Sequence, residues 1–215
     1  DQKAALRALN TEAAALQSQF QQRLLAAVKS GGLVVDYAHQ LAGLSDDEIS
    51  AAAEAAQEKG LGGRWLLPLL NTTQQPALVS LQDRQTRENL FAAGWTRNQK
   101  GDANDTRELV LRLAELRARK AQLLGADDFA SWSMADQMAG DPAEAFAFMR
   151  RIAPAAKARA EQELADIQQV IDNEGGDFRA AAWDWLYYAE QVRRAKFAID
   201  EAQLKPYFAL DRVLR

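Results

Sequence analysis

An apolar stripe runs through the chain from Gln2 to Lys29. Its members recur in steps of three and four residues, which is the spacing of one face of an α-helix. They are Leu6, Leu9, Ala13, Leu16, Phe20, Leu24 and Ala27. The stripe predicts a long amphipathic helix that ends at the glycines after Ser30. A coiled coil would show similar spacing, but small residues such as Ala13 and Ala27 favour close packing against another helix of the same domain.

A second helix is marked at both of its ends. Ser45 and Glu48 form an S-x-x-E capping box, in which the serine oxygen accepts from a first-turn amide and the glutamate reaches back to the amide of the cap. The box predicts a helix that runs to about Lys59 and is stopped by Gly60.

A third start signal lies later in the chain. Asp141 is a cap residue, Pro142 occupies the first helical position and Glu144 the third. This pattern predicts a helix towards Asn173, which Pro154 should kink because proline lacks the amide for the helical hydrogen bond.

Two more helices are predicted between these signals. Pro76 should begin a helix through Leu90, with an extension to Trp95. Asp105 is the predicted N-cap of the next helix, which Gly125 ends. Its apolar face is formed by Leu109, Leu113, Leu116 and Leu123.

Short β-branched or apolar runs bounded by glycine predict two strands, at residues 33–36 and 65–67. The chain is therefore expected to be mainly α: a multi-helical domain with long antiparallel helices and a β element of two or three strands at most. We treat residues 1–215 as one helical unit and place a sub-boundary near residues 101–105 or 125–141.

Composition excludes several classes of protein. The 26 Lys and Arg residues against 30 Asp and Glu give a formal charge of −4, which argues against binding of nucleic acid through phosphate contacts. A weak nucleic-acid alternative uses a basic helix face with Arg112, Arg117, Arg119 and Lys120.

No apolar run is long enough for a membrane helix, so no membrane partner is expected. Cytoplasm or periplasm both fit a chain without cysteine, and we favour cytoplasm.

The residues that usually carry catalysis are scarce. His39 is the single histidine and there is no cysteine, so a Ser-His-Asp triad would require His39 as its base, and a zinc site lacks the second imidazole or the thiolates it needs. We expect His39 at the surface of the connection between a strand and a helix. The alternation of Asp102, Asn104 and Thr106 is similar to a calcium loop, but the required glycine and final glutamate are missing, which favours a simple turn. We assign no catalytic, cofactor-binding or metal-binding residue.

The stretch WDWLYYAEQVRRAKFAIDEAQLKPYF, residues 183–208, is unusually aromatic. A helix here would be apolar on two sides and should be buried on both, so core packing is favoured over direct contact with a ligand. One side is formed by Trp185, Tyr188 and Val192, and the other by Trp183 and Tyr187. Asp200 and Gln203 then predict a cap for a short helix that Pro206 limits.

Several segments in register resemble one protein family. They are GDANDTRELVLRLAELRARKAQLLG (101–125), DQMAGDPAEAFAFM (136–149) and the aromatic stretch 183–208. Their order and spacing are similar to those of the thimet-oligopeptidase-like zinc metallopeptidases. NTTQQPAL (71–78) looks most like the bacterial peptidyl-dipeptidase branch. The resemblance covers the chain from near Gln2 to near Arg215.

This resemblance implies hydrolysis of short, unstructured peptides in a channel between two helical halves, with release of C-terminal dipeptides. In the family, zinc is held by a His-Glu-x-x-His helix and a further glutamate. No such motif occurs here. We therefore expect an internal fragment that forms scaffold and channel wall, inactive alone, with the aromatic stretch as core at the channel base. The zinc would belong to the remaining catalytic part of the same chain.

A different class of protein stays open, namely a stand-alone helical interaction module without an enzymatic parent. The coding sequence after Arg215 would decide between the two: a His-Glu-x-x-His motif there supports the peptidase, and a stop codon supports the module. For the fragment we also expect exposed apolar surface that drives dimerisation.

Overall fold

The structure, a computed structural model, describes residues 1–72, 74–197 and 205–208. Its helices and strands confirm the mainly α prediction. Within these residues the α-helices are α1 (Gln2–Ser30), α2 (Asp46–Glu58), α3 (Arg84–Trp95), α4 (Arg107–Leu123), α5 (Phe129–Met134), α6 (Pro142–Asn173) and α7 (Trp185–Phe197). Short 3-10 helices are η1 (Ala38–Leu41), η2 (Pro76–Val79) and η3 (Lys205–Phe208), and the strands are β1 (Gly32–Val35) and β2 (Trp65–Pro68).

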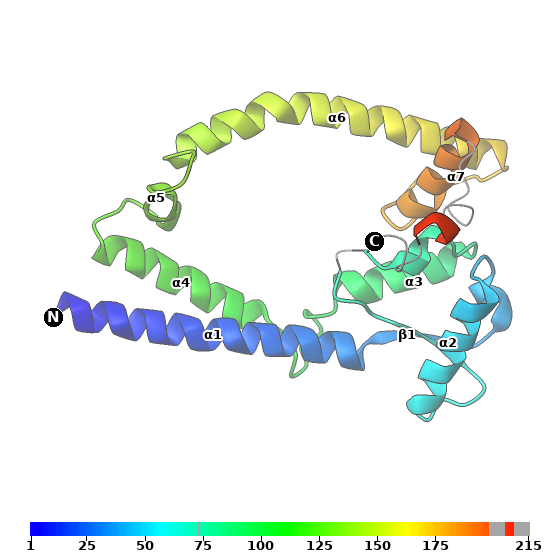
Figure 1. The fold of residues 1–215 in the computed structure, drawn as a ribbon, viewed down its shortest axis with the longest axis horizontal. Coiled ribbons are helices and arrows are strands. Elements are labelled where there is room, and N and C mark those ends of the chain that lie inside the picture. The colour runs from blue at the N-terminus through cyan, green and yellow to red at the C-terminus, as the bar shows by residue number, and fades with distance from the viewer. Residues whose placement is uncertain (73, 198–204, 209–215) are drawn as a thin grey trace.

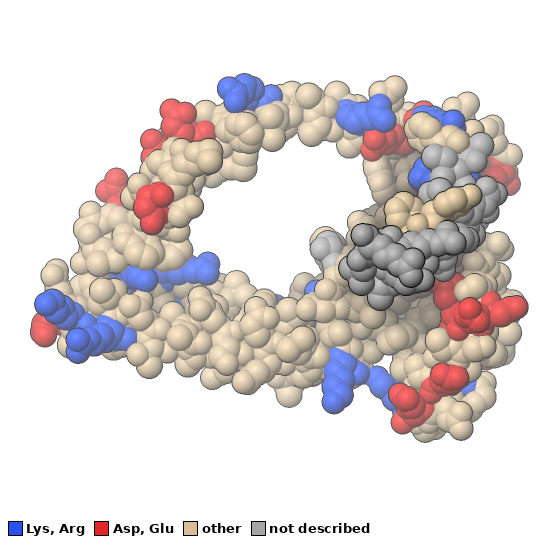
Figure 2. Space-filling model, in the orientation of Figure 1, with Lys and Arg blue, Asp and Glu red and all other residues tan. Residues whose placement is uncertain are grey.

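The elements form an open frame (Figure 1). Helices α1 and α4 lie side by side along one edge, α5 makes a corner, and α6 runs along the opposite edge. The other end of the frame is more compact and holds α2, α3, α7 and the two strands. In the space-filling view the opening passes between the two edges (Figure 2).

Helices α1 and α4 are antiparallel, as the residues that join them show. Arg23, late in α1, donates to the carbonyl of Asp105 just before α4, and the Asn98 side chain donates to the Arg23 carbonyl at 3.3 Å. Further along, Arg112 Nε lies 2.7 Å from the Glu12 carboxylate. The predicted long helix therefore packs within the chain against a second helix.

The Glu12–Arg112 pair should make this edge sensitive to acid. The hydrogen bond from Arg112 holds the pKa of the Glu12 carboxyl below its ordinary value of 4.5. A lowered folded-state pKa stabilises the fold above the unfolded-state pKa, and this stabilisation is lost as pH falls through the lowered value. Glu12→Gln should therefore reduce the urea midpoint slightly at neutral pH and have no effect in strong acid. Glu54→Gln is the control, because Glu54 is exposed on α2 and forms no ion pair among the described residues. Equal effects of the two substitutions at neutral pH would contradict the prediction.

The main core lies at the compact end. Strands β1 and β2 pair antiparallel, with Val35 opposite Trp65 and Gly32 opposite Pro68. Helices α2 and α3 pack on this sheet, and the buried side chains are aliphatic throughout. They are Val35, Leu41, Leu44, Ala52, Leu67, Leu69, Leu78, Leu81 and Leu90.

The predicted continuous helix from Pro76 to Leu90 is wrong. Only residues 76–79 form a 3-10 turn, and α3 starts after Asp83, whose carboxylate accepts from the Thr86 amide at 2.8 Å. The Arg87 side chain donates to the carbonyls of Leu81 and Gln82, both at 2.9 Å, so side-chain hydrogen bonds take the place of helical ones at these two carbonyls. The expected extension of this helix to Trp95 is confirmed.

The predicted cap of α4 is also wrong by one residue. Thr106 is the N-cap and makes no side-chain capping bond. The Asp105 carboxylate accepts instead from the amides of Gly101 and Arg107, at 2.8 and 3.0 Å. The Arg107 side chain also binds this carboxylate and holds the Asp105 pKa well below its usual range.

Other end signals are confirmed. The capping box of α2 is present, with the Ser45 amide 2.8 Å from the Glu48 carboxylate. Asp141 caps α6, which continues through Pro154 and changes direction in its first half (Figure 1). The sequence reasoning missed α5, a short helix capped by Asp128, which accepts from the Ser131 amide at 2.8 Å.

Candidate functional site

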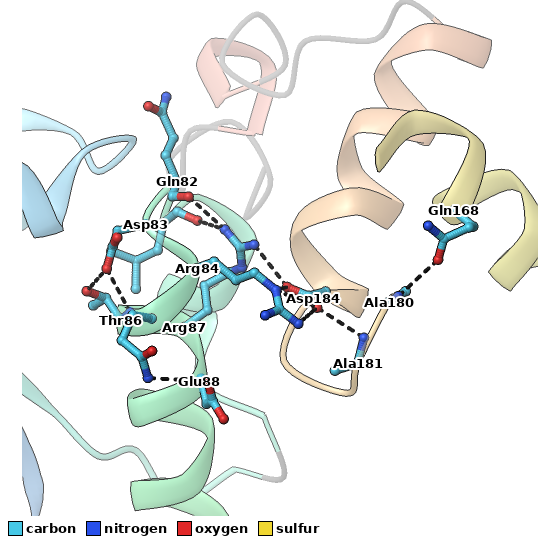
Figure 3. A network of polar contacts seen from close by, with 12 residues as sticks. Gln82, Asp83, Arg84, Thr86, Arg87, Glu88, Gln168, Ala180, Ala181 and Asp184 are labelled. Carbon is cyan, nitrogen blue, oxygen red and sulfur yellow. Dashed lines mark hydrogen bonds and ion pairs between the residues drawn. The ribbon is translucent and has the colours of Figure 1, made fainter. Parts of the chain in front are cut away.

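The most elaborate polar cluster joins α3 to the start of α7 (Figure 3). Asp184 lies just before α7 and is completely buried. Its carboxylate accepts from Arg84 Nη2 at 2.9 Å, from Arg87 Nη2 at 3.0 Å and from the Ala181 amide at 3.0 Å. Both arginines come from the first turn of α3. The contact therefore ties together residues that are about 100 positions apart in sequence.

Arg87 depends strongly on this carboxylate. Its side chain is only 1% exposed, so its charge has little access to water. Besides Asp184, the guanidinium reaches the backbone carbonyls of Leu81 and Gln82, while its Nε has no partner among the described residues. Asp184 is thus the counter-ion that makes burial of Arg87 tolerable.

Aromatic rings surround the two arginines. The Arg84 guanidinium lies 4.1 Å from the ring centre of Phe178, and that of Arg87 lies 4.4 Å from the ring of Tyr187. Tyr188 is buried, and this burial raises the pKa of its hydroxyl. Core packing of the first part of the aromatic stretch is therefore confirmed, with Trp185 half-buried on α7.

The end of that stretch behaves differently. Tyr207 and Phe208 in η3 are exposed. The predicted cap formed by Asp200 and Gln203 lies outside the described residues.

The Asp184 cluster has the properties of a structural junction. A general base needs a lone pair that a substrate can reach, whereas this carboxylate is enclosed and already accepts from two guanidinium groups and one amide. Sequence reasoning passed over all three residues. One signal was present: an aspartate between two tryptophans, expected to be buried, requires a cationic partner.

A more accessible hollow lies beside the C-terminal end of α3. It has a volume of about 510 Å³ and is lined by Asn71, Thr72, Trp95, Arg97 and Gln99. The loop that carries the first two residues is fixed by Gln75, whose amide bonds both the amide and the carbonyl of Leu70, at 2.7 and 3.2 Å. Arg97 donates to the Gly94 carbonyl at 2.8 Å. Amides, one hydroxyl and one cation can bind polar groups, and the described lining residues include no histidine, cysteine or carboxylate.

The residues weighed as metal ligands do not come together. His39 is exposed in η1, where its ring stacks on Tyr37 at 5.7 Å, as expected for a surface residue. The Asp102 carboxylate accepts from the Asn104 amide at 2.8 Å, which fits the predicted turn. Across residues 1–72, 74–197 and 205–208, no three His, Cys, Asp or Glu side chains are grouped so that they could hold a metal ion.

The basic face weighed for nucleic acid is occupied by contacts within the chain. Arg117 lies over the ring of Phe129 and Lys120 over that of Trp132, at 5.2 and 4.2 Å. Arg112 binds two glutamates.

Among the described helices, none combines the length and the hydropathy that crossing a membrane requires.

Comparison with known proteins gives consistent matches. Residues 77–215 match the profile of peptidase family M3. The whole chain is 64% identical to dipeptidyl carboxypeptidase of Salmonella typhimurium, of which it covers 32%. It is also 64% identical to dipeptidyl carboxypeptidase of Escherichia coli, over 99% of this chain and 31% of that protein. Oligopeptidase A of Haemophilus influenzae is 30% identical over 93% of this chain. The chain thus spans about a third of the length of these curated relatives.

Proposed function

Because the chain belongs to peptidase family M3, we propose that it is a structural portion of a peptidase that releases dipeptides from the C-terminus of short peptides. The observation that carries this proposal is the 64% identity, over the full 215 residues, to a protein named for dipeptidyl carboxypeptidase activity. The more distant oligopeptidase A is also a peptidase by name, which supports the general class.

The contribution of residues 1–215 would be scaffold and channel wall. Two long edges and a compact end frame an opening, a shape that suits the lining of an enclosed chamber (Figure 1). The described residues offer buried ion pairs and aliphatic cores but no group of metal ligands. We therefore place the zinc ligands of the family in polypeptide outside residues 1–215, which would also supply the hydrolytic chemistry.

The activity can be tested on the full-length polypeptide that contains this chain. With a short peptide that has a free C-terminus, mass spectrometry should show successive loss of dipeptides, and a chelator should stop it. Residues 1–215 alone should give no chelator-sensitive hydrolysis. The matched substrate control is the same peptide with an amidated C-terminus, which should be cleaved much more slowly if the terminal carboxylate is recognised.

Two outcomes would contradict the proposal. Chelator-sensitive hydrolysis by residues 1–215 alone would show that this chain carries the chemistry itself. A folded full-length polypeptide that cleaves no peptide would instead favour the non-enzymatic interaction module.

A further inference from the structure

The first half of α6 is poorly covered. Its end packs on α7 through Ile167 and Ile171, and its start contacts α5, but the stretch between has few neighbours among the described residues. Large apolar side chains stand in this stretch. They are Phe146, Phe148, Met149 and Ile152, each about half-exposed at 48–54%.

These four residues form one broad face. At 100° per residue, their positions fall within less than half of the helix circumference. Arg150 and Arg151 lie on the remaining side and lean over Phe146 and Phe148, at 5.9 and 5.4 Å from the ring centres. A helix with one apolar and one cationic side is built to be covered on the apolar side. We call these four residues the α6 face.

A second apolar group stands at the other side of the frame. Trp95, the last residue of α3, is 61% exposed, and the end of α3 lies beside the opening (Figure 1). On α4, Val110 and Leu111 are also exposed. In the space-filling view, uncharged surface dominates the arm formed by α6 (Figure 2). Two edges of the frame thus present apolar side chains that the described residues leave in water.

We propose that the α6 face is a docking surface for the part of the same polypeptide that lies outside residues 1–215. We choose this occupant because of the length of the relatives. They match this chain over its whole length at 64% identity, yet about two thirds of their own length lies outside the match. The rest of such a polypeptide has to contact residues 1–215, and the α6 face is an apolar surface that the described residues leave uncovered. The inference rests on the proposed function in that both treat this chain as part of a longer peptidase.

Two other occupants fit less well. A second copy of the chain would pair one patch with itself, and a single such contact would not also cover Trp95 beyond the opening. A peptide substrate would occupy the face only during turnover and would leave four large side chains in water at other times.

Thiol labelling tests the proposal. The chain has no cysteine, so Met149→Cys introduces one reporter on the α6 face, and the unsubstituted full-length polypeptide gives the background. In the full-length polypeptide, labelling of Met149→Cys by a maleimide should be at least about tenfold slower than that of Lys157→Cys, because a covered thiol is inert. The control position Lys157 is 77% exposed and pairs only loosely with Glu161, at 3.6 Å.

Each outcome decides the question. Equal labelling rates at the two positions would overturn the proposal. Protection that rises with protein concentration would assign the face to a second copy, and protection that appears only with added peptide would assign it to substrate. If Met149→Cys does not fold, as judged by circular dichroism, Phe146→Cys reports on the same face. Peptidase activity is measured separately, so an inactive polypeptide with a protected thiol would refute the proposed function while leaving the docking surface intact.

Discussion

Replacing Asp184 with alanine is expected to lower the free energy of unfolding by about 3–5 kcal/mol, because removal of one partner from a buried ion pair leaves the other charge uncompensated. The stranded charge is Arg87, which is 1% exposed and has no other carboxylate partner among the described residues. Arg84 would also lose its partner but can turn towards water, since it is 35% exposed. Urea unfolding followed by tryptophan fluorescence measures the loss, with Trp183 close to the cluster as a local probe.

Asp166→Ala is the matched control. It removes an aspartate that also joins α7 to another helix, through Lys196, but both partners are partly exposed at 33% and 51%. Exposed pairs of this kind contribute about 0–1 kcal/mol. If the two substitutions destabilise the protein equally, Asp184 is not the counter-ion on which burial of Arg87 depends.

The Asp184 junction also matters for the proposed channel wall. It fixes α7 to α3, and α7 in turn carries the end of α6 through the Ile167, Ile171 and Tyr188 cluster. Among the described residues, this junction therefore helps to hold the edge formed by α6 to the compact end, together with the packing of α7 on η2 and of Leu186 on the main core. We infer that loss of Asp184 would disturb the position of the α6 face as well as the stability of the chain.

Some helix ends were predicted from local signals, although two equally local caps, Asp83 and Asp128, were missed. Ser45 with Glu48, and Asp141 with the amide of Glu144, each satisfy backbone groups within four residues, so the sequence alone contains the partners. The apolar stripe of α1 was likewise sufficient to place a long helix. The two short strands followed from β-branched and apolar residues between glycines.

One error occurred where a partner far along the chain, Asp184, holds the side chain that decides the local structure. The segment between Pro76 and Asp83 fails to continue as helix because Arg87 takes the carbonyls of Leu81 and Gln82, and Arg87 is held there by Asp184. The error at α4 was local: Thr106 is the N-cap, while the Asp105 carboxylate accepts from the amides of both Gly101 and Arg107. Periodicity and propensity report on neighbours along the chain and do not register a partner such as Asp184, 97 residues from Arg87.

In the candidate site, too, some features could be predicted from the sequence and others depended on packing. His39 was predicted at the surface because its possible partners are missing from the composition, and the structure agrees. The junction of Arg84, Arg87 and Asp184 was missed because the position of Asp184 between two tryptophans indicates a buried carboxylate but not which arginines pair with it. The three residues come together because the start of α7 packs on the first turn of α3 (Figure 3).

Gly43→Ala is expected to lower the free energy of unfolding by about 2–5 kcal/mol, because it combines the strain of a positive φ with overpacking. Gly43 has φ +95°, and a Cβ there would lie 2.0 Å from the Ser80 carbonyl oxygen and 3.0 Å from Gln82 Cγ. The close approach is structural, since the Gln82 amide donates to the Ala42 carbonyl at 2.9 Å and so joins the entry of α2 to the start of α3.

The control for this prediction separates the cost of the backbone strain at positive φ from the cost of steric overlap of the new Cβ. Gly60 has a similar backbone conformation, with φ +72°, but nothing lies within 4 Å of a Cβ built there. Gly60→Ala should therefore cost only the conformational part, about 1–2 kcal/mol. Urea midpoints of the two variants measure the difference. A smaller loss at Gly43 than at Gly60 would mean that the loop at residues 42–44 moves away from Ser80 at little cost. In that case the contact between these two loops would not be what holds the entry of α2 to the start of α3.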